Sequence, residues 1–82
     1  MNLYVANLPY ETTESEFEAA FEPYGRITRV TIVKDRDTGR SRGFGFIEFQ
    51  DKDAGQQALS EMNGADFNGR ALVVDQAKES RR

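Results

Sequence analysis

The 82-residue chain contains no cysteine and no histidine. Without cysteine there is no disulfide, no thiolate nucleophile and no zinc ribbon. Without histidine the chain also lacks the commonest general base and the commonest metal ligand. The remaining carboxylates form no paired Asp/Glu motif, and the segment DRDTG at residues 35–39 lacks the length and ligand pattern of a calcium loop. We therefore expect no catalytic centre, no metal site and no cofactor.

Long hydrophobic runs are also missing. No apolar stretch approaches the ~20 residues that span a bilayer, and no basic segment followed by an apolar one suggests a secretory signal at the N-terminus. A hydrophobic content of 38% and a charged content of 30% are typical of one soluble globular domain. We expect a monomer without membrane contact, located in the cytoplasm because the lack of cysteine suits a reducing compartment, with the nucleus left open.

Positive charge is scarce overall but concentrated in one segment. The formal net charge is -3, which by itself argues against a polyanionic partner. The distribution is uneven, because residues 1–25 hold five glutamates and no Lys or Arg, whereas residues 26–45 hold six basic residues and two aspartates. This basic segment runs directly into the sequence RGFGFIEF at residues 42–49. Such charge asymmetry points to a partner.

Hydrophobic periodicity in the first part of the chain predicts a strand followed by a helix. Residues 2–6 alternate in the manner of a strand. Thr13 with Glu16 three residues later has the form of a capping box, so a helix is expected to begin at Thr13. Gly25 is expected to end it, after an irregular last turn caused by Pro23.

The rest of the chain predicts two further strands, a helix and a last strand. Residues 27–33 are rich in β-branched side chains and are expected to form a strand, followed by a polar loop over residues 35–41 and a strand over residues 42–49. Asp51 is a candidate N-cap for a second helix, which Gly55 weakens slightly. The apolar positions expected on that helix are Ala54, Ala58, Leu59 and Met62.

The last strand is expected to follow two turn signals. The pairs Asn63-Gly64 and Asn68-Gly69 bracket Phe67, and the alternating Leu72 and Val74 come next. The order strand, helix, strand, strand, helix, strand is the split βαβ arrangement, so we expect an α+β, ferredoxin-like βαββαβ sandwich. Its four-stranded antiparallel sheet would carry both helices on one face.

Alternation within RGFGFIEF decides which rings are buried. Phe44, Phe46 and Glu48 share one face of a strand. The opposite face carries Ile47 and Phe49. A carboxylate is rarely buried without a partner, so the Glu48 face is expected to be exposed, together with Tyr4 of the first strand. Core packing is the alternative for these rings. The expected exposed face comprises Tyr4, Arg29, Thr31, Phe44, Phe46, Glu48, Val73 and Asp75.

Two segments of the sequence resemble motifs of the RNA recognition motif family. Residues 42–49 match its octapeptide K/R-G-F/Y-G/A-F-V-x-F/Y with Ile47 in place of Val. The hexapeptide LYVANL at residues 3–8 resembles the companion motif, and DRDTG resembles the usual loop between the second and third strands. The resemblance implies that Tyr4 and Phe46 each stack a base, that Phe44 lies against sugars and that Arg42 pairs with phosphate.

The predicted partner is single-stranded RNA, with single-stranded DNA left open. The domain is expected to span residues 1–77, followed by a charged tail over residues 78–82. The stacking candidates are Tyr4, Phe44 and Phe46; the phosphate candidates are Arg42, Arg40, Lys34 and Arg29; the candidate base contacts are Asn2, Glu48, Asp75, Gln76 and Lys78. Glu48 and Asp75 could accept hydrogen bonds from base amino groups or be bystanders that weaken binding.

A protein-binding module is the alternative. The same fold could engage a peptide through its sheet or through the acidic first helix. The acidic balance of the chain supports this alternative, whereas the complete set of aromatic positions favours RNA.

Overall fold

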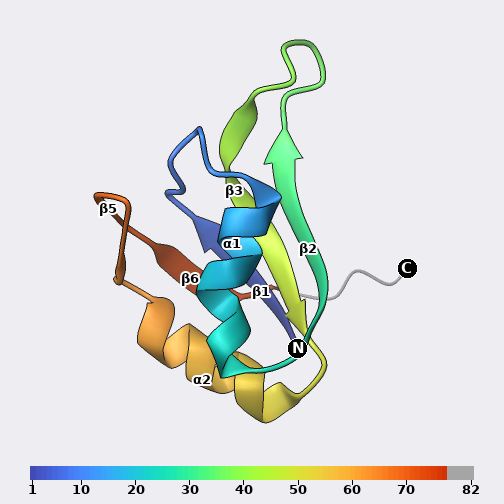
Figure 1. The fold of residues 1–82 in the computed structure, drawn as a ribbon, viewed down its shortest axis with the longest axis vertical. Helices are drawn as coiled ribbons and strands as arrows, with labels where there is room; N and C mark the ends of the chain where they lie inside the picture. The colour runs from blue at the N-terminus through green and yellow to red at the C-terminus, as the bar shows by residue number, and fades with distance from the viewer. Residues whose placement is uncertain (78–82) are drawn as a thin grey trace.

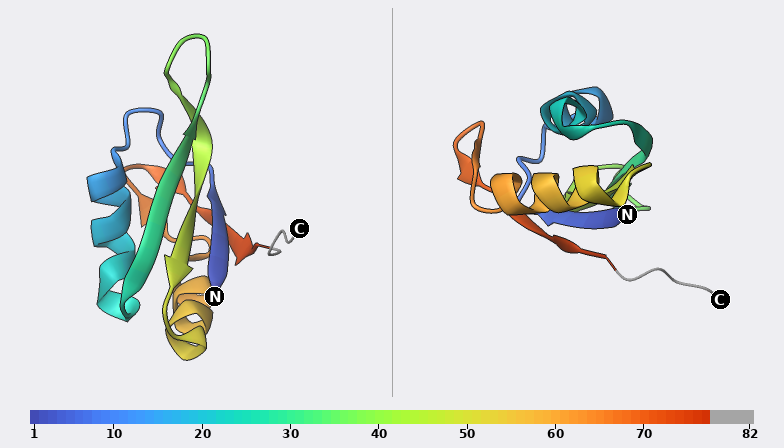
Figure 2. Two further views of the ribbon diagram at one scale, coloured as in Figure 1. Left: turned by 90° about the vertical axis from the view of Figure 1, so that its right-hand side faces the viewer. Right: turned by 90° about the horizontal axis from the view of Figure 1, so that it is seen from below.

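A computed structural model describes residues 1–77 and shows one layer of helices on one layer of sheet (Figures 1 and 2). The elements follow one another as β1 (Asn2–Ala6), α1 (Glu14–Phe21), the short 3-10 helix η1 (Glu22–Tyr24), β2 (Ile27–Lys34), β3 (Ser41–Phe49), α2 (Lys52–Met62), β4 (Asp66–Phe67), β5 (Arg70–Ala71) and β6 (Val73–Gln76). No helix within residues 1–77 is long and apolar enough to cross a membrane.

The main sheet has four antiparallel strands in the order β2-β3-β1-β6. Both helices cover the same face, which Figure 2 shows edge-on, so the opposite face carries no helix. The predicted βαββαβ fold is therefore confirmed. We call the uncovered side of the sheet the ring face.

The start and end of α1 follow the signals in the sequence. The Thr13 hydroxyl accepts from the Glu16 backbone N–H at 3.1 Å, and the Glu16 carboxylate accepts from the Thr13 N–H at 3.1 Å, which completes the predicted capping box. The helix ends at Phe21 and tightens into η1, which contains Pro23. The irregular last turn expected before Gly25 is thus confirmed.

The start of α2 differs from the expectation in one respect. Asp51 occupies the N-cap position, but its side chain makes no capping hydrogen bond. Its negative charge still lies at the positive end of the helix dipole. Gly55 is buried in the helix, and a Cβ added there would come within 2.7 Å of the Met1 sulfur.

The core lies between the helices and the inner face of the sheet. Phe17 and Phe21 of α1 are fully buried and meet edge to face, with ring centroids 5.5 Å apart. Phe67 is half-buried and packs against the margin of this core. The fully buried side chains from the strands include Leu3, Val5, Ile47 and Phe49.

A short hairpin precedes the last strand. The strands β4 and β5 pair through a turn in which Asn68 has φ +50° and Gly69 has φ +91°. Positive φ at both central residues is the requirement of the tight hairpin turn that Asn-Gly favours. The Asn68-Gly69 turn was expected from the sequence, whereas the two short strands that it joins were not.

Candidate nucleic-acid interface

Three rings meet on the ring face at the centre of the sheet. The register pairs Tyr4 of β1 with Phe46 of β3, and it pairs Ala6 with Phe44. Ring centroids are 5.8 Å apart for Tyr4 and Phe46, 5.7 Å for Tyr4 and Phe44, and 6.4 Å for the two phenylalanines. All three side chains are partly exposed, whereas Ile47 and Phe49 are buried on the other side. We call Tyr4, Phe44 and Phe46 the ring cluster.

The two glycines of RGFGF position these rings for different reasons. At Gly45 a Cβ would collide with the backbone carbonyl oxygen of Thr31 and come within 3.1 Å of the Phe17 ring. Gly43 instead has φ +83° and lies where the pairing of β2 with β3 shifts between Ile32 and Lys34. This irregularity bends the strand just before Phe44.

Both carboxylates of the ring face have neighbours within the sheet. Glu48 lies between Arg29 on β2 and Asn2 on β1 in the strand register. Opposite charges directly across a strand pair attract one another, and the register places Arg29 opposite Glu48. Asp75 lies opposite Tyr4, and its carboxylate accepts from the Gln76 backbone N–H at 2.8 Å.

Arg42 lies beside the ring cluster, with its guanidinium carbon 6.0 Å from the centre of the Phe44 ring. It lines a hollow of about 260 Å³ together with Phe44, Tyr10 and Arg70. We call this the Arg42–Arg70 hollow. Sequence reasoning missed Tyr10, which is 65% exposed, and Arg70. The Asn68-Gly69 turn signal is the feature that could have indicated a chain reversal delivering Arg70 here.

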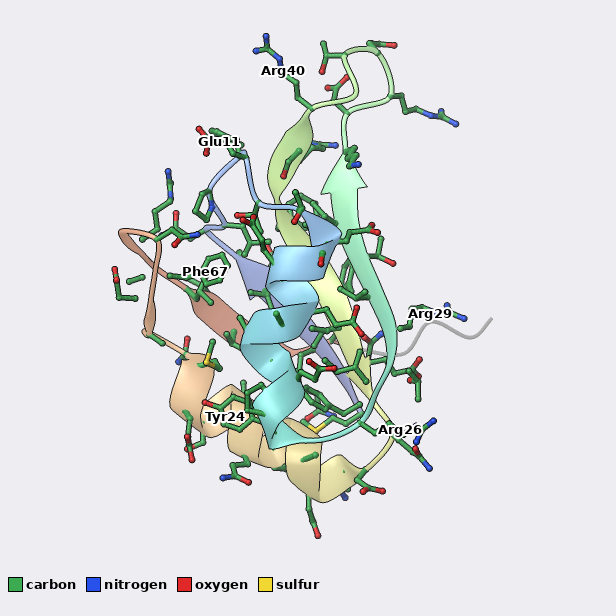
Figure 3. All side chains as sticks on the ribbon, viewed as in Figure 1. Glu11, Tyr24, Arg26, Arg29, Arg40 and Phe67 are labelled. Atoms are coloured by element: carbon green, nitrogen blue, oxygen red, sulfur yellow. The ribbon has the colours of Figure 1, made fainter. Side chains whose placement is uncertain are left out.

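Lys34 and Arg40 lie elsewhere. Both line a separate hollow of about 730 Å³ formed with the loop that leads into α1, including Glu11 and Glu14. Figure 3 shows Glu11 and Arg40 at the end of the molecule where the β2–β3 loop projects. The structure therefore does not bring these two basic residues together with the ring cluster, and their mixed surroundings make them weaker phosphate candidates than Arg42.

The last two candidates are Gln76, at the end of β6, and Lys78. Gln76 pairs with Leu3, whose side chain is fully buried on the helix-covered side. Because paired residues point to the same side of a sheet, Gln76 belongs to the side opposite the ring cluster. Lys78 lies outside the described residues.

The loop between β2 and β3 has its own internal order. The Asp35 carboxylate accepts from the backbone N–H groups of Asp37 at 2.8 Å and Thr38 at 3.1 Å. These bonds, first that of Thr38 and then that of Asp37, lower the pKa of Asp35, and the charge of Arg42 adds to them. The loop is thus held by the ionised form of an exposed aspartate.

Within residues 1–77, no group of three or more Asp or Glu side chains is close enough to hold a metal ion. The functional geometry is instead an open sheet face with a central cluster of partly exposed rings and a guanidinium at its margin. Flat aromatic surfaces stack on nucleobases, and guanidinium groups pair with phosphate. The structure thus defines an α+β domain with an aromatic platform on an open sheet.

Comparison with known proteins gives the family. The model of the RNA recognition motif matches residues 3–73. The RNA-binding protein RbpD of Nostoc is 44% identical over 78 residues, covering 95% of this chain and 83% of that protein. The crystal structure of RNA Binding Protein PG1 superposes with a TM-score of 0.95 at 40% identity, covering 100% of this chain and 99% of that one. The chain therefore belongs to the RNA recognition motif family.

Other relatives are longer than this chain. The mitochondrial glycine-rich RNA-binding protein 4 of Arabidopsis thaliana is 43% identical, and the match covers 94% of this chain and 57% of that protein. The human cleavage stimulation factor subunit 2 tau variant is 41% identical, with 93% of this chain and 12% of that protein covered. A Sex-lethal protein/RNA complex superposes with a TM-score of 0.91 at 32% identity, over 98% of this chain and 48% of that one.

Proposed function

We propose that the ring face binds single-stranded RNA by stacking bases on the ring cluster. The observation that carries this proposal is the mutual contact of Tyr4, Phe44 and Phe46 on a sheet face that no helix covers. Family membership and the solved complex of a related protein with RNA support the choice of ligand. A duplex keeps its bases stacked on one another, so these rings favour a single strand.

Each residue of the platform has a distinct role in this proposal. Tyr4 and Phe46 stack one base each, Phe44 packs against sugars, and Arg42 pairs with a phosphate. Arg29 keeps Glu48 from repelling the ligand. Binding requires no covalent step, so catalysis forms no part of the function.

The strength of binding follows from the number of stacks. Each base stacked on an aromatic ring contributes about 1–3 kcal/mol to the free energy of binding. Two or three such contacts, less the entropy lost when the RNA and the side chains are ordered, give a Kd on the order of micromolar. If two or three phosphates are neutralised, log K should fall against log salt concentration with a slope of about -1.5 to -2.

Fluorescence anisotropy with a labelled random-sequence RNA, single-stranded and as a duplex, tests the proposal. We expect the single strand to bind in the micromolar range with the shallow salt slope, and the duplex to bind much more weakly. Equal affinity for both, or a much steeper slope, would show that diffuse charge rather than stacking drives binding.

The alternative, a protein interaction through the acidic first helix, has lost part of its support. Glu14 accepts from the Ile32 backbone N–H, and Glu16 completes the capping box, so both serve the fold. The charge reversals Glu18→Lys and Glu22→Lys discriminate between the functions. They should leave RNA affinity unchanged or slightly improved, whereas an interaction through the acidic helix would be lost.

A further inference from the structure

The Arg42–Arg70 hollow continues from the ring face, and two of its lining residues, Tyr10 and Arg70, lie outside the two family motifs at residues 3–8 and 42–49. It has a volume of about 260 Å³ and shares Tyr4 and Phe44 with the ring cluster. Its remaining polar lining includes Arg42, Arg70 and Asn7, with no carboxylate among the lining residues. In a chain with net charge -3, a cavity with two guanidinium groups and no acid is suited to an anion.

Arg70 is held in place before any ligand arrives. The side-chain oxygen of Asn7 accepts from Arg70 Nη2 at 2.7 Å and from Nε at 3.2 Å. Asn7 is itself fixed, because its amide nitrogen donates to the Ala71 carbonyl at 2.8 Å. Since Nη1 of Arg70 takes no part in these bonds, it is free to donate to a ligand. A guanidinium that is already oriented loses less entropy on binding a phosphate.

Tyr10 supplies a flat surface at the same hollow. Its side chain is 65% exposed and lines the hollow with Arg42 and Arg70. A Cβ added to Gly43 would lie 3.3 Å from the Tyr10 ring, so this ring packs beside Gly43, where the pairing of β3 is irregular. The combination of an exposed ring and two cations matches the combination of base and phosphate in a nucleotide.

We propose that the Arg42–Arg70 hollow is a further nucleotide subsite, which extends the RNA path from the ring cluster past Phe44. A backbone phosphate lies between Arg42 and Arg70, and the adjoining base packs on Tyr10. This inference rests on the proposed RNA binding by the ring face. Asn7 is a positioning residue, since it acts by orienting Arg70.

The test compares the wild type with Arg70→Gln, Tyr10→Ala and the control Arg26→Gln. Arg26 is exposed and lies at the other end of the molecule from β5 (Figures 1 and 3). Anisotropy titrations with a random-sequence single-stranded RNA at several salt concentrations give the affinity and the salt slope. Thermal unfolding of each variant confirms that it is folded.

Each substitution has its own expected signature. Arg70→Gln should weaken binding about tenfold and reduce the magnitude of the salt slope by up to about 0.7, because one of the two guanidinium groups at this phosphate is lost. Tyr10→Ala should weaken binding at least about fivefold with the slope unchanged, because stacking is lost and no charge is removed. Arg26→Gln should bind as the wild type does. A merely structural role of Arg70 would not change the slope.

A second readout does not depend on the variants folding. In the wild type, RNA should shift the NMR signals of the Arg70 Nε–H and of the Asn7 side-chain amide. If the wild type binds RNA but these signals stay in place and both variants match Arg26→Gln, the subsite is refuted while the proposed function stands. If the wild type binds no RNA, both proposals fail.

Discussion

At the scale of single residues, Gly45 of β3 and Gly55 of α2 show how the surroundings of a glycine can exclude a side chain. The inner position Gly45 lies against the Thr31 carbonyl and the Phe17 ring, so the sheet and α1 meet where no Cβ fits. Gly55 also lacks space, but its near neighbours all belong to the Met1 side chain, whose sulfur at 2.7 Å can turn away although its Cβ at 2.9 Å must shift. Replacing each of these two glycines by alanine should therefore lower the free energy of unfolding by different amounts.

We predict that Gly45→Ala lowers the free energy of unfolding by about 1–3 kcal/mol, because the added methyl overpacks a site bounded by backbone. Gly55→Ala is the matched control. The Met1 sulfur can turn away while the Met1 Cβ must shift slightly, and alanine gains up to about 1 kcal/mol in helix propensity, so the net loss should be smaller than at Gly45. Urea unfolding of the three proteins measures both values. Equal losses at the two sites would contradict the steric explanation.

The loop between β2 and β3 depends on a titrating residue. Backbone hydrogen bonds from Thr38 and Asp37 lower the pKa of Asp35 below its ordinary value of 3.8. A lowered folded-state pKa means that the ionised form stabilises the folded loop above the unfolded-state pKa. That contribution is lost as the pH falls through the folded-state pKa.

An NMR titration of the Asp35 carboxyl carbon should give a pKa below the value measured for the same residue in urea. The amide signals of Asp37 and Thr38 should shift with the same midpoint, because their N–H groups lose the carboxylate acceptor. A folded-state midpoint at or above the value in urea would show that these bonds do not hold the loop.

The ring cluster could be predicted from single residues, whereas the Arg42–Arg70 hollow could not. The strict alternation of RGFGFIEF and the charge of Glu48 are local, so they fix which rings face outward. The position of Lys34 follows a shift in the pairing of β2 with β3 after Ile32, which no local pattern in the sequence marks. Arg70 reaches Asn7 across 63 positions of sequence, and no local pattern encodes such a contact.

At the scale of elements, each edge strand of the main sheet has one backbone N–H that donates to a side chain. On β2 the Ile32 N–H donates to the Glu14 carboxylate at 3.3 Å, and on β6 the Val74 N–H donates to the Asn63 side-chain oxygen at 3.0 Å. Glu14 begins α1 and Asn63 follows α2, so each helix contributes one cap to an edge strand. Unpaired edge groups invite pairing with another chain, and these side chains occupy them.

Glu14→Ala and Asn63→Ala should each lower the free energy of unfolding by about 1–3 kcal/mol, because each leaves a half-buried N–H without its acceptor. Glu14→Gln retains an acceptor oxygen and should lose much less. Glu18→Ala on the same helix is the control and should stay within about 0.5 kcal/mol of the wild type. Urea unfolding measures these differences. If Glu14→Ala matches Glu18→Ala, the edge bond is unimportant.

Irregularities within elements were harder to predict than the elements themselves. Ile27 and Val30 are three residues apart, which does not fit a regular strand with both side chains on one face. The structure resolves this through a shift in the pairing of β2 with β3 between Ile27 and Arg29. The position of such a bulge depends on the partner strand. The apolar pattern therefore indicates that the strand is irregular but does not show at which residue the pairing shifts.

At the scale of the whole molecule, the fold follows from agreement among independent signals. Capping, periodicity and turn residues all indicate the same order of elements, and two family motifs fall on adjacent central strands. Function depends instead on the distribution of charge. The five glutamates of residues 1–25 lie in α1 and its flanking segments, while Arg42 and Arg70 gather at one end of the ring face. An acidic protein can thereby present a local site for an anion.

The most direct test of the central claim is an anisotropy titration of the wild type and of Phe44→Ala/Phe46→Ala with short random-sequence RNA, at two salt concentrations. Both proteins must first be shown to fold, which is expected because both rings are only partly buried. We predict micromolar binding by the wild type and a loss of about 2 kcal/mol or more in the folded double variant. Equal binding by the two folded proteins, or no binding by either, would contradict the account.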